Sequence, residues 1–451
     1  MNSKFLVLLV VLAIGIPAFG QQSGKVLSLK DCIRIALDKN YSVETSQNTL
    51  ELSRLNARRS YSNILPRVNS SFTAGRYQVG EATYLGDVPN PITGEVKQIT
   101  LTREGFKRNS YSANFSVTQN IFDGGFWWNE IRRTRTLKKA AANDFSSTQN
   151  NVIKLVAQYY FDLLKQKKLL EVYSLAVRRS QDQLNRAQQM YEIGSVAQVD
   201  VYRARVNLGQ DRIAYLNQKN TVRQAQKALN VAMGRDPLTP IVIDSTVNFQ
   251  LTIPDSTTLL EIATRNQPTL KSRELEVRAK ELSVATAKSS FFPTIGASFR
   301  YNRDNELMEK IYSDLDKNWS ISYGIQISYN LFNGFNDKIN YQTSKIELKN
   351  SRLALEDYKR NLKTTVTNLY NTYKSILEIV EINKANLEAS REEYRLASER
   401  YRLGSGTSLE LREAQVNLTQ AEQVLVSAEY NAIITYIELL EALGTVRDVL
   451  N

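Results

Sequence analysis

The residue types that most often carry catalysis or bind metals are scarce in this sequence. It contains no histidine, so the commonest general base and the commonest metal ligand are missing. The single cysteine, Cys32, cannot form an internal disulfide, and we expect a small buried helix residue rather than a nucleophile. No Gly-rich phosphate loop is present, and the many Asp and Glu residues have helix-surface spacing. The sequence therefore argues against an enzyme and predicts no cofactor and no metal site.

The start of the chain and its charge balance indicate an exported protein. Lys4 precedes an apolar run that ends in small residues near Gly20, which is typical of a cleaved secretory signal. We predict a signal peptide at 1–20 and a mature chain of about +11, from 57 basic and 46 acidic residues. Anionic lipid or lipopolysaccharide is the expected acidic neighbour, rather than nucleic acid. An uncleaved anchor is the alternative, but the apolar run is shorter than the about 20 residues that a spanning helix needs.

The remaining chain contains one unit twice. Residues 115–124 (FSVTQNIFDG) align with 325–334 (IQISYNLFNG), and 191–194 (YEIG) align with 401–404 (YRLG). Both pairs are 210 positions apart. Matches at one spacing predict an internal duplication. The predicted repeats are 21–240 and 241–451.

The two copies differ in length near their middle. The offset is 227 at Pro66 and Pro293, so the first copy has 17 extra residues between this proline and its FDG motif. These residues fall at about 77–110, a stretch rich in Gly, Pro and Asn. We interpret this stretch as a loop.

The hydrophobic period changes along each copy. Each begins with a helix that ends at the shared proline, because proline cannot continue a helix. Alternating apolar and polar residues follow, and we predict a strand pair at 67–122 and another at 293–332. The second strand of each pair has apolar residues on one face and polar residues on the other. Such runs have the length and alternation of membrane-crossing strands, although a half-buried strand of a soluble sheet has the same local pattern.

After each strand pair the period becomes seven residues. Val156, Leu163 and Leu170 begin one series, and the corresponding second-copy series begins at Val366. This repeat is typical of coiled-coil packing. We predict long helical hairpins at 126–234 and 336–444, with turns at glycines. The predicted tip glycines are Gly194, Gly404 and Gly406.

Four strands of this kind cannot form a closed barrel alone. The smallest membrane barrels have about eight strands, and an open edge in lipid leaves backbone groups without partners. Three copies would supply twelve strands and continue into a helical tube. The predicted barrel lumen is lined by Ser116, Thr118, Asn120, Gln326, Ser328 and Asn330. Trp127 and Trp128 follow the strand end, where they suit the membrane interface; ordinary packing between helix and strand is the alternative.

In this combination of features the sequence resembles the outer-membrane efflux proteins, or TolC-like channels. The resemblance spans nearly the whole mature chain, through both strand-to-helix motifs and both Tyr-x-x-Gly hairpin tips. It implies an α+β membrane protein: a trimeric, twelve-stranded transmembrane β-barrel, with four strands per chain, continued by a long periplasmic α-helical coiled-coil barrel. It also implies a periplasmic adaptor protein and an inner-membrane transporter as partners. The implied function is the outer-membrane exit duct of a tripartite efflux pump or a type I secretion system.

The resemblance further implies which residues close the periplasmic entrance. In the family an aspartate on the first tip bonds to a tyrosine on the second, and the matching positions are Asp200 and Tyr401. Acidic residues one turn apart give the family's entrance its cation selectivity, and Glu410 and Glu413 hold those positions. An arginine of some family gates is replaced by Gly406, and Arg203 is a candidate substitute. For each of these charges the alternative is an ordinary solvated helix face.

The competing functional class is a periplasmic coiled-coil adaptor or an envelope-spanning structural protein. An adaptor needs β-rich domains flanking one hairpin, whereas this sequence has two hairpins, each preceded by a strand pair. We therefore expect a channel in the outer membrane, with its helical part in the periplasm. The transported substrate, the individual partners and the resting state of the gate are not specified by the sequence.

Overall fold

The structure is a computed structural model that describes residues 26–245 and 254–450, so the predicted signal peptide lies outside the described residues. The chain divides into two compact units, and each draws segments from both halves of the sequence. The first unit comprises Met1–Glu44, Gln149–Leu259 and Val366–Asn451. The second unit comprises Thr45–Thr148 and Leu260–Thr365.

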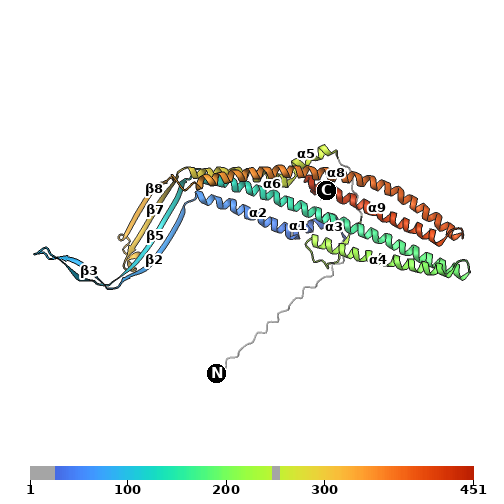
Figure 1. The fold of residues 1–451 in the computed structure, drawn as a ribbon, viewed down its shortest axis with the longest axis horizontal. Coiled ribbons are helices and arrows are strands. Elements are labelled where there is room, and N and C mark those ends of the chain that lie inside the picture. Colours follow the sequence, from blue (N-terminus) through green and yellow to red (C-terminus); the bar gives the residue numbers. More distant parts are fainter. Residues whose placement is uncertain (1–25, 246–253, 451) are drawn as a thin grey trace, which may run out of the picture. The chain divides into compact units, whose positions relative to one another are not determined.

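Long helices dominate the described chain, and its strands other than the two-residue β1 and β6 lie within 67–122 and 294–328 (Figure 1). The helices are α1 (Leu29–Lys39), α2 (Tyr41–Arg59), α3 (Phe126–Glu192), α4 (Gln198–Ala232), α5 (Ser256–Asn266), α6 (Pro268–Lys288), α7 (Glu309–Tyr312), α8 (Asn336–Arg402) and α9 (Ser408–Leu443). The strands are β1 (Val26–Leu27), β2 (Arg67–Val79), β3 (Ala82–Pro89), β4 (Val96–Arg103), β5 (Phe106–Phe122), β6 (Val242–Ile243), β7 (Thr294–Asn305) and β8 (Trp319–Ser328).

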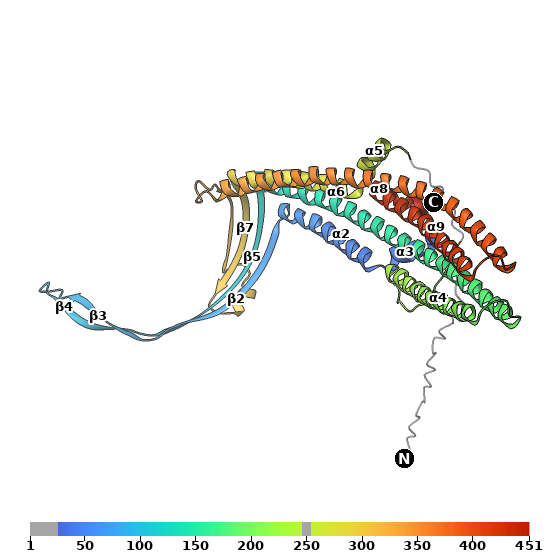
Figure 2. The same cartoon turned by 45° about the vertical axis from the view of Figure 1, so that its right-hand side comes forward.

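The first unit contains α4, α9 and the later parts of α3 and α8 (149–192 and 366–402), which form the antiparallel hairpins α3–α4 and α8–α9 (Figure 2). The residues at seven-residue steps form its core, since Val156, Leu163, Val366 and Leu439 are fully or almost fully buried. This burial confirms the coiled-coil interpretation of the heptads. Among the described residues, no helix combines the length and apolar character needed to cross a membrane.

The first described residues of the chain belong to a short two-stranded parallel sheet in the first unit. β1 pairs with β6 through Val26 and Val242, and the Tyr160 hydroxyl donates a 2.8 Å hydrogen bond to the Asp244 carbonyl. Cys32 on α1 is completely buried in this region, as expected. Burial, with a smaller contribution from Asp31, raises the pKa of the Cys32 thiol to about 12, so the thiol is inert at neutral pH.

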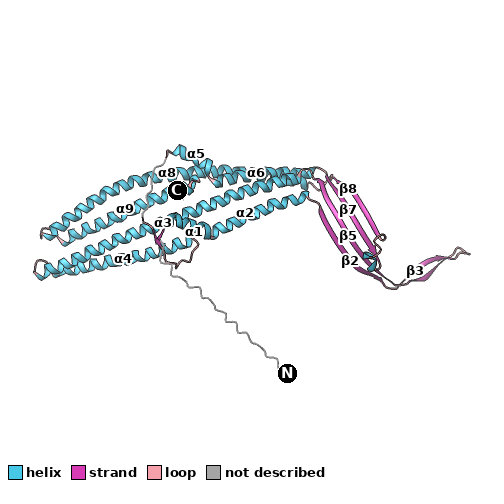
Figure 3. Cartoon of the chain, turned by 180° about the vertical axis from the view of Figure 1, so that it is seen from behind, coloured by secondary structure: helices cyan, strands magenta, loops and turns pink. Residues whose placement is uncertain are grey.

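The second unit contains an antiparallel four-stranded sheet in the order β2-β5-β7-β8 (Figure 3). Each neighbouring pair is antiparallel, and the two halves of the sequence meet where β5 pairs with β7. β2 and β8 are the edges of this sheet, so each leaves one row of backbone groups without a strand partner in the described residues. A β-bulge at Ile121 places Phe122, and not Ile121, opposite Ile295 on the apolar face.

The prediction of a loop at about 77–110 is wrong. β2 continues to Val79, β5 begins at Phe106, and β3 and β4 between them pair as a separate two-stranded ribbon. The residues that suggested a loop gather in the turn, where Asn90 accepts a hydrogen bond from the Ile92 amide and Gly94 has φ +74°. Tyr84, Ile99 and their β-branched neighbours instead favour strands on either side of the turn.

The corresponding connection between β7 and β8 is organised by a buried arginine. The guanidinium of Arg303 contacts the carbonyls of Lys310, Ser313, Asp314 and Leu315 at 2.8 to 3.1 Å. Only 4% of Arg303 is exposed. Because a charged group so buried must be satisfied by several acceptors, this side chain fixes the path of the connection around α7.

Candidate channel wall and entrance

The four-stranded sheet has one polar and one apolar face, because side chains at paired positions point to the same side. One row across all four strands is polar: Asn69, Ser116, Arg300 and Ser322. The adjacent row is apolar or aromatic: Val68, Val117, Phe299 and Tyr323. The described residues leave the apolar face uncovered, since Tyr323 is 84% exposed and Ile325 is 70% exposed. Exposed apolar surface of this extent indicates contact with lipid or with another protein.

The structure places five of the six predicted lumen residues on the polar face. The register aligns Thr118 with Ser298, Asn120 with Gly296, and Gly296 with Gln326. The sixth residue, Asn330, lies beyond the end of β8 at Ser328 and outside the sheet. The prediction that the strand continued to residue 332 is therefore wrong.

Sequence reasoning missed further residues of the polar face. Asn69 on β2 and Ser298, Arg300 and Asn302 on β7 share it with the predicted residues. The same alternation that identified the apolar residues of β2 and β7 carries this signal, since the intervening positions must face the other side.

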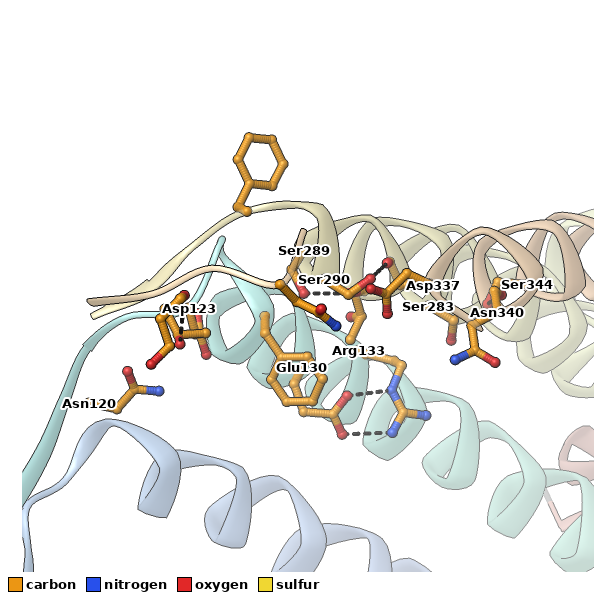
Figure 4. A pocket seen from close by; sticks show the side chains of 17 residues that line it. Asn120, Asp123, Glu130, Arg133, Ser283, Ser289, Ser290, Asp337, Asn340 and Ser344 are labelled. Atoms are coloured by element: carbon orange, nitrogen blue, oxygen red, sulfur yellow. Dashed lines mark hydrogen bonds and ion pairs between the residues drawn. The ribbon is translucent and has the colours of Figure 1, made fainter. Parts of the chain in front are cut away.

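A polar cavity of about 730 Å³ lies where the strands pass into α3 and α8 (Figure 4). Asn120, Ser328 and Asn330 line it, so Asn330 lies near the two strand residues with which it was predicted to act. Arg133 and Glu130 form a bidentate ion pair at 2.6 and 2.8 Å on its α3 side. A polar lining suits a hydrated surface.

The FDG and FNG motifs make the turns that start the long helices. Asp123 accepts a 3.1 Å hydrogen bond from the Trp127 amide, and Gly124 has φ +69°. At the matching place Gly334 has φ +66°. Trp127 and Trp128 therefore lie in the first turn of α3, with ring centroids 4.6 Å apart, and Trp128 is exposed.

Both hairpin tips have the same glycine turn. Gly194 and Gly404 have φ +76° and +75°, and the next residue donates its amide to the carbonyl of Met190 or Arg400. This pattern ends a helix with a left-handed residue. At Gly406 the constraint is space rather than a left-handed φ, because an added Cβ would lie 3.0 Å from the Cβ of Arg400. A side chain at position 406 would therefore crowd the end of α8.

The described chain does not make the predicted hydrogen bond between Asp200 and Tyr401. Asp200 instead accepts a 2.7 Å bond from the Ser408 hydroxyl. The Tyr401 hydroxyl is buried and makes no hydrogen bond among the described residues. Asp200 and Tyr401 nevertheless line the same cavity. Burial, and then the negative charge of Asp200, raises the pKa of Tyr401, against a lowering by Arg186.

The other predicted entrance charges are exposed. Glu410 caps the start of α9 in a capping box with Thr407, and Arg400 lies 3.6 Å from it. Glu413 lies one turn further on the same helix. Arg203 approaches Asp200 at 3.8 Å, with 65% of its side chain exposed. Arg203 therefore forms only a weak ion pair, and its partner lies on its own helix.

A cavity of about 470 Å³ lies between the two tips. It is lined by residues of α3, α4, α8 and α9, including Gln183, Asp200, Tyr401 and Ser408. Two buried polar atoms without partners in the described residues belong to its lining, the Gln183 Oε1 and the Tyr401 hydroxyl.

Comparison with known proteins gives consistent matches along the chain. A sequence profile described as "Outer membrane efflux protein" matches residues 32–235 and 259–445. The "Probable efflux pump outer membrane protein TtgC" of Pseudomonas putida is 22% identical over 428 residues, covering 92% of this chain and 83% of that protein.

Solved structures share the fold. A crystal structure of CusC, described in relation to transmembrane channel formation, superposes with a TM-score of 0.80 at 17% identity and covers 92% of both chains. The Campylobacter jejuni CmeC outer membrane channel superposes with a TM-score of 0.79 at 16% identity, covering 99% of this chain and 94% of that one.

Proposed function

Because this chain belongs to the outer membrane efflux protein family, we propose that three copies assemble into the outer-membrane exit duct of an export machine. The family consists of passive conduits rather than enzymes, so the chain itself supplies a path and not the energy for transport. The proposed duct has a β-barrel in the outer membrane and a helical tube in the periplasm. The relative TtgC is described as the outer membrane protein of an efflux pump.

One observation carries the trimer proposal: an amphipathic sheet with two free edges. Membrane strands need every backbone group paired, which a four-stranded sheet with open β2 and β8 edges does not achieve. Pairing β8 of one copy with β2 of the next satisfies both edges and forms a ring. Three sheets of four strands give the proposed twelve-stranded barrel, with the polar rows inside and the apolar rows toward lipid.

The predicted internal duplication supports the same assembly. The two hairpins of one chain have long helices of equal length, 67 residues in both α3 and α8. We take the repeats 21–240 and 241–451 as pseudo-equivalent subunits of the tube. A trimer then contains six hairpins in alternation, which is how the predicted tip residues of both repeats reach one entrance.

The proposed duct requires partner proteins, and its charged residues suggest a lipid partner. A periplasmic adaptor and an inner-membrane transporter are expected because an exit duct of an efflux pump has no energy source. Arg76, Lys107 and Arg108 lie near the ends of β2 and β5 that are remote from the helices, where they can contact lipopolysaccharide phosphates. The adaptor interpretation of this chain is disfavoured, because the family profile spans both hairpins and both strand pairs.

Cross-linking of the two edges tests the trimer. A Cys32→Ser background that carries Asn69→Cys on β2 receives a second cysteine at Ser320, Ser322 or Gly324 on β8. We expect at least one pair to form disulfide-linked trimers under oxidation, with the matching mass in detergent. Asn69→Cys combined with Ser298→Cys on the interior strand β7 is the control and should give none. Monomers throughout, with no edge pair cross-linked, would contradict the proposal.

A further inference from the structure

Two arginines lie on the polar face of the four-stranded sheet. Arg300 on β7 is paired with Ser116 on β5 and with Ser322 on β8. Arg67 on β2 is paired with Thr118 on β5, which places it on the same face in the adjacent row. Both arginines are exposed. All of these residues belong to the second compact unit.

These two arginines differ from the other arginines of the sheet in having no partner. Arg303 is held by backbone carbonyls, and Arg76 and Arg108 each contact an acceptor side chain at 2.9 Å. Within the described residues, neither Arg67 nor Arg300 has an ion-pair partner or a side-chain hydrogen bond. Their guanidinium groups are therefore free to bind an anion from outside the chain.

The strand residues beside them on this face are neutral groups that can form hydrogen bonds. The acidic strand residue of the polar face, Asp304, lies four residues beyond Arg300, and its carboxylate accepts a 2.7 Å hydrogen bond from the Asn302 amide. Hydroxyl and amide groups supply further donors to an oxyanion that an arginine binds. The neighbours in the two rows are Asn69, Ser116, Ser322, Thr118, Ser298 and Gly324.

The surface around Arg67 is hollowed into a cavity of about 540 Å³. Arg67, Thr118 and Ser298 contribute to its lining. Asp123 also lines it, but the Asp123 carboxylate is engaged by the Trp127 amide at the start of α3. Cavities of a few hundred cubic ångströms suit small molecules. The cavity therefore offers a small anionic molecule both room and a cation.

In the proposed trimer the two arginines are evenly spaced around the barrel wall. β5 separates β2 from β7, and pairing β8 with β2 of the next copy places β8 between β7 and that strand. An arginine then projects from every second strand, two per copy and six in three copies. Twelve strands about 4.8 Å apart and tilted by about 40° form a wall with a radius of roughly 12 to 15 Å. Because the Debye length is about 8 Å at physiological ionic strength, the positive field of these side chains covers much of the lumen.

We propose that Arg67 and Arg300 of the three copies form a cationic ring that binds small molecules carrying phosphate or carboxylate groups as they pass through the barrel. This inference rests on the proposed function. A guanidinium binds either oxyanion through two parallel hydrogen bonds, and rings of basic side chains favour anions in pores. The ring opposes the cation preference that Glu410 and Glu413 give to the entrance.

Single-channel recording of the purified full-length protein in planar bilayers tests the ring, with tripolyphosphate and citrate as the phosphate and carboxylate probes. Each probe should reduce the current of conducting wild-type channels. The double variant Arg67→Gln/Arg300→Gln should need at least about tenfold more probe, because charge-assisted hydrogen bonds are lost. In a KCl gradient the same variant should show a stronger cation preference, since positive charge has left the lumen.

The conservative variant separates charge from binding geometry. Arg67→Lys/Arg300→Lys keeps the positive field but cannot bind an oxyanion through a planar fork. It should therefore retain the wild-type reversal potential while weakening the block by both probes. A general disturbance of the barrel would alter both readouts together.

Arg103→Gln is the matched control, because it removes one positive charge per copy from β4, outside the four-stranded sheet. It should leave the block and the reversal potential unchanged. Wild-type channels that neither probe blocks, or equal block of the wild type and the Gln double variant, would overturn the ring. The same loss of block in Arg103→Gln would also overturn it. A wild-type protein that forms no channel would instead contradict the proposed function.

Discussion

Glu410 and Asp200 each make a local contact within the chain that is separate from the role proposed for them at the channel entrance. Glu410 caps α9, and Asp200 accepts a hydrogen bond from the Ser408 hydroxyl. Both contacts stabilise the fold whether or not the protein forms a channel. Their proposed channel role therefore depends on charge, not on these local bonds. Substitutions that keep the local bonds and remove the charge separate the two roles.

The acidic pair provides such a substitution. Gln can replace Glu in a capping box, so Glu410→Gln together with Glu413→Gln should change the free energy of unfolding by no more than about 0.5 kcal/mol. The cation preference, measured as the reversal potential in a KCl gradient, should fall toward zero because two negative charges per copy are lost. Glu388→Gln on α8 is the matched control. An unaltered reversal potential in the double variant would remove these residues from the selectivity site.

Cys32 gives a residue-scale prediction that is independent of assembly. Its pKa is raised to about 12 by burial, so only about one thiol in ten thousand is ionised at pH 8. Because the raised pKa keeps the thiol protonated, maleimide labelling of the folded protein should be very slow at pH 8 and should become rapid in denaturant. Rapid labelling without denaturant, followed by mass spectrometry, would show that α1 does not bury this residue.

The predicted contact between Asp200 and Tyr401 shows which details of a site cannot be predicted from the sequence. The family resemblance placed Asp200 and Tyr401 together, and they are close, but Ser408 takes the hydrogen bond. Only geometry decides which of two nearby hydroxyls reaches a carboxylate. The hydrogen-bonded pair of Asp211 on α4 and Arg412 on α9 was missed for a related reason: a polar residue at a poorly exposed helix position looks like a solvated one until its partner on another helix is known.

Elements were predicted better than contacts because they depend on local period. Seven-residue steps located the long helices, and Val156, Leu163 and Val366 are buried as coiled-coil positions require. The β3–β4 ribbon was missed because the Gly, Pro and Asn residues that suggested a loop over 77–110 gather in its turn, whereas the residues on either side of the turn form strands. Asn330 was wrongly placed in a strand for the opposite reason: the alternation of apolar and polar residues continues in the sequence beyond Ser328, where β8 ends.

The paired strand-to-helix turns allow a matched test of an element boundary. Gly124 and Gly334 have nearly the same positive φ, but a Cβ at Gly124 would lie 2.4 Å from the Ser289 carbonyl oxygen, whereas Gly334 has open space. Alanine at Gly334 should therefore cost only the about 1–2 kcal/mol of a left-handed residue. Gly124→Ala adds a backbone overlap and should lower the melting temperature in detergent clearly more. Equal losses would contradict the close approach.

At the scale of the whole molecule, the sheet explains why one chain is insufficient. Its polar and apolar rows run unbroken across β2, β5, β7 and β8, which spans both halves of the sequence. A soluble protein would cover the apolar face with other elements. In this chain that face is exposed in the described residues, which fits a barrel wall in lipid.

Adjacent residues on opposite faces test this orientation. Ile325→Arg places a charge on the proposed lipid face and should reduce assembly in the outer membrane, at a cost of about 2–4 kcal/mol near the bilayer centre. Gln326→Arg places the same charge on the proposed lumen face and should assemble normally. Heat-resistant oligomer in outer-membrane fractions measures both. Equal assembly of the two variants, or the reverse order, would contradict the assigned faces.

The most direct measurement is single-channel conductance of the purified protein in a planar bilayer, with its oligomeric mass determined in the same detergent. The proposed exit duct predicts a trimer with small, mostly closed and cation-preferring events. A monomer or dimer that inserts no conductance would contradict it, and the four strands would then belong to a sheet outside the membrane.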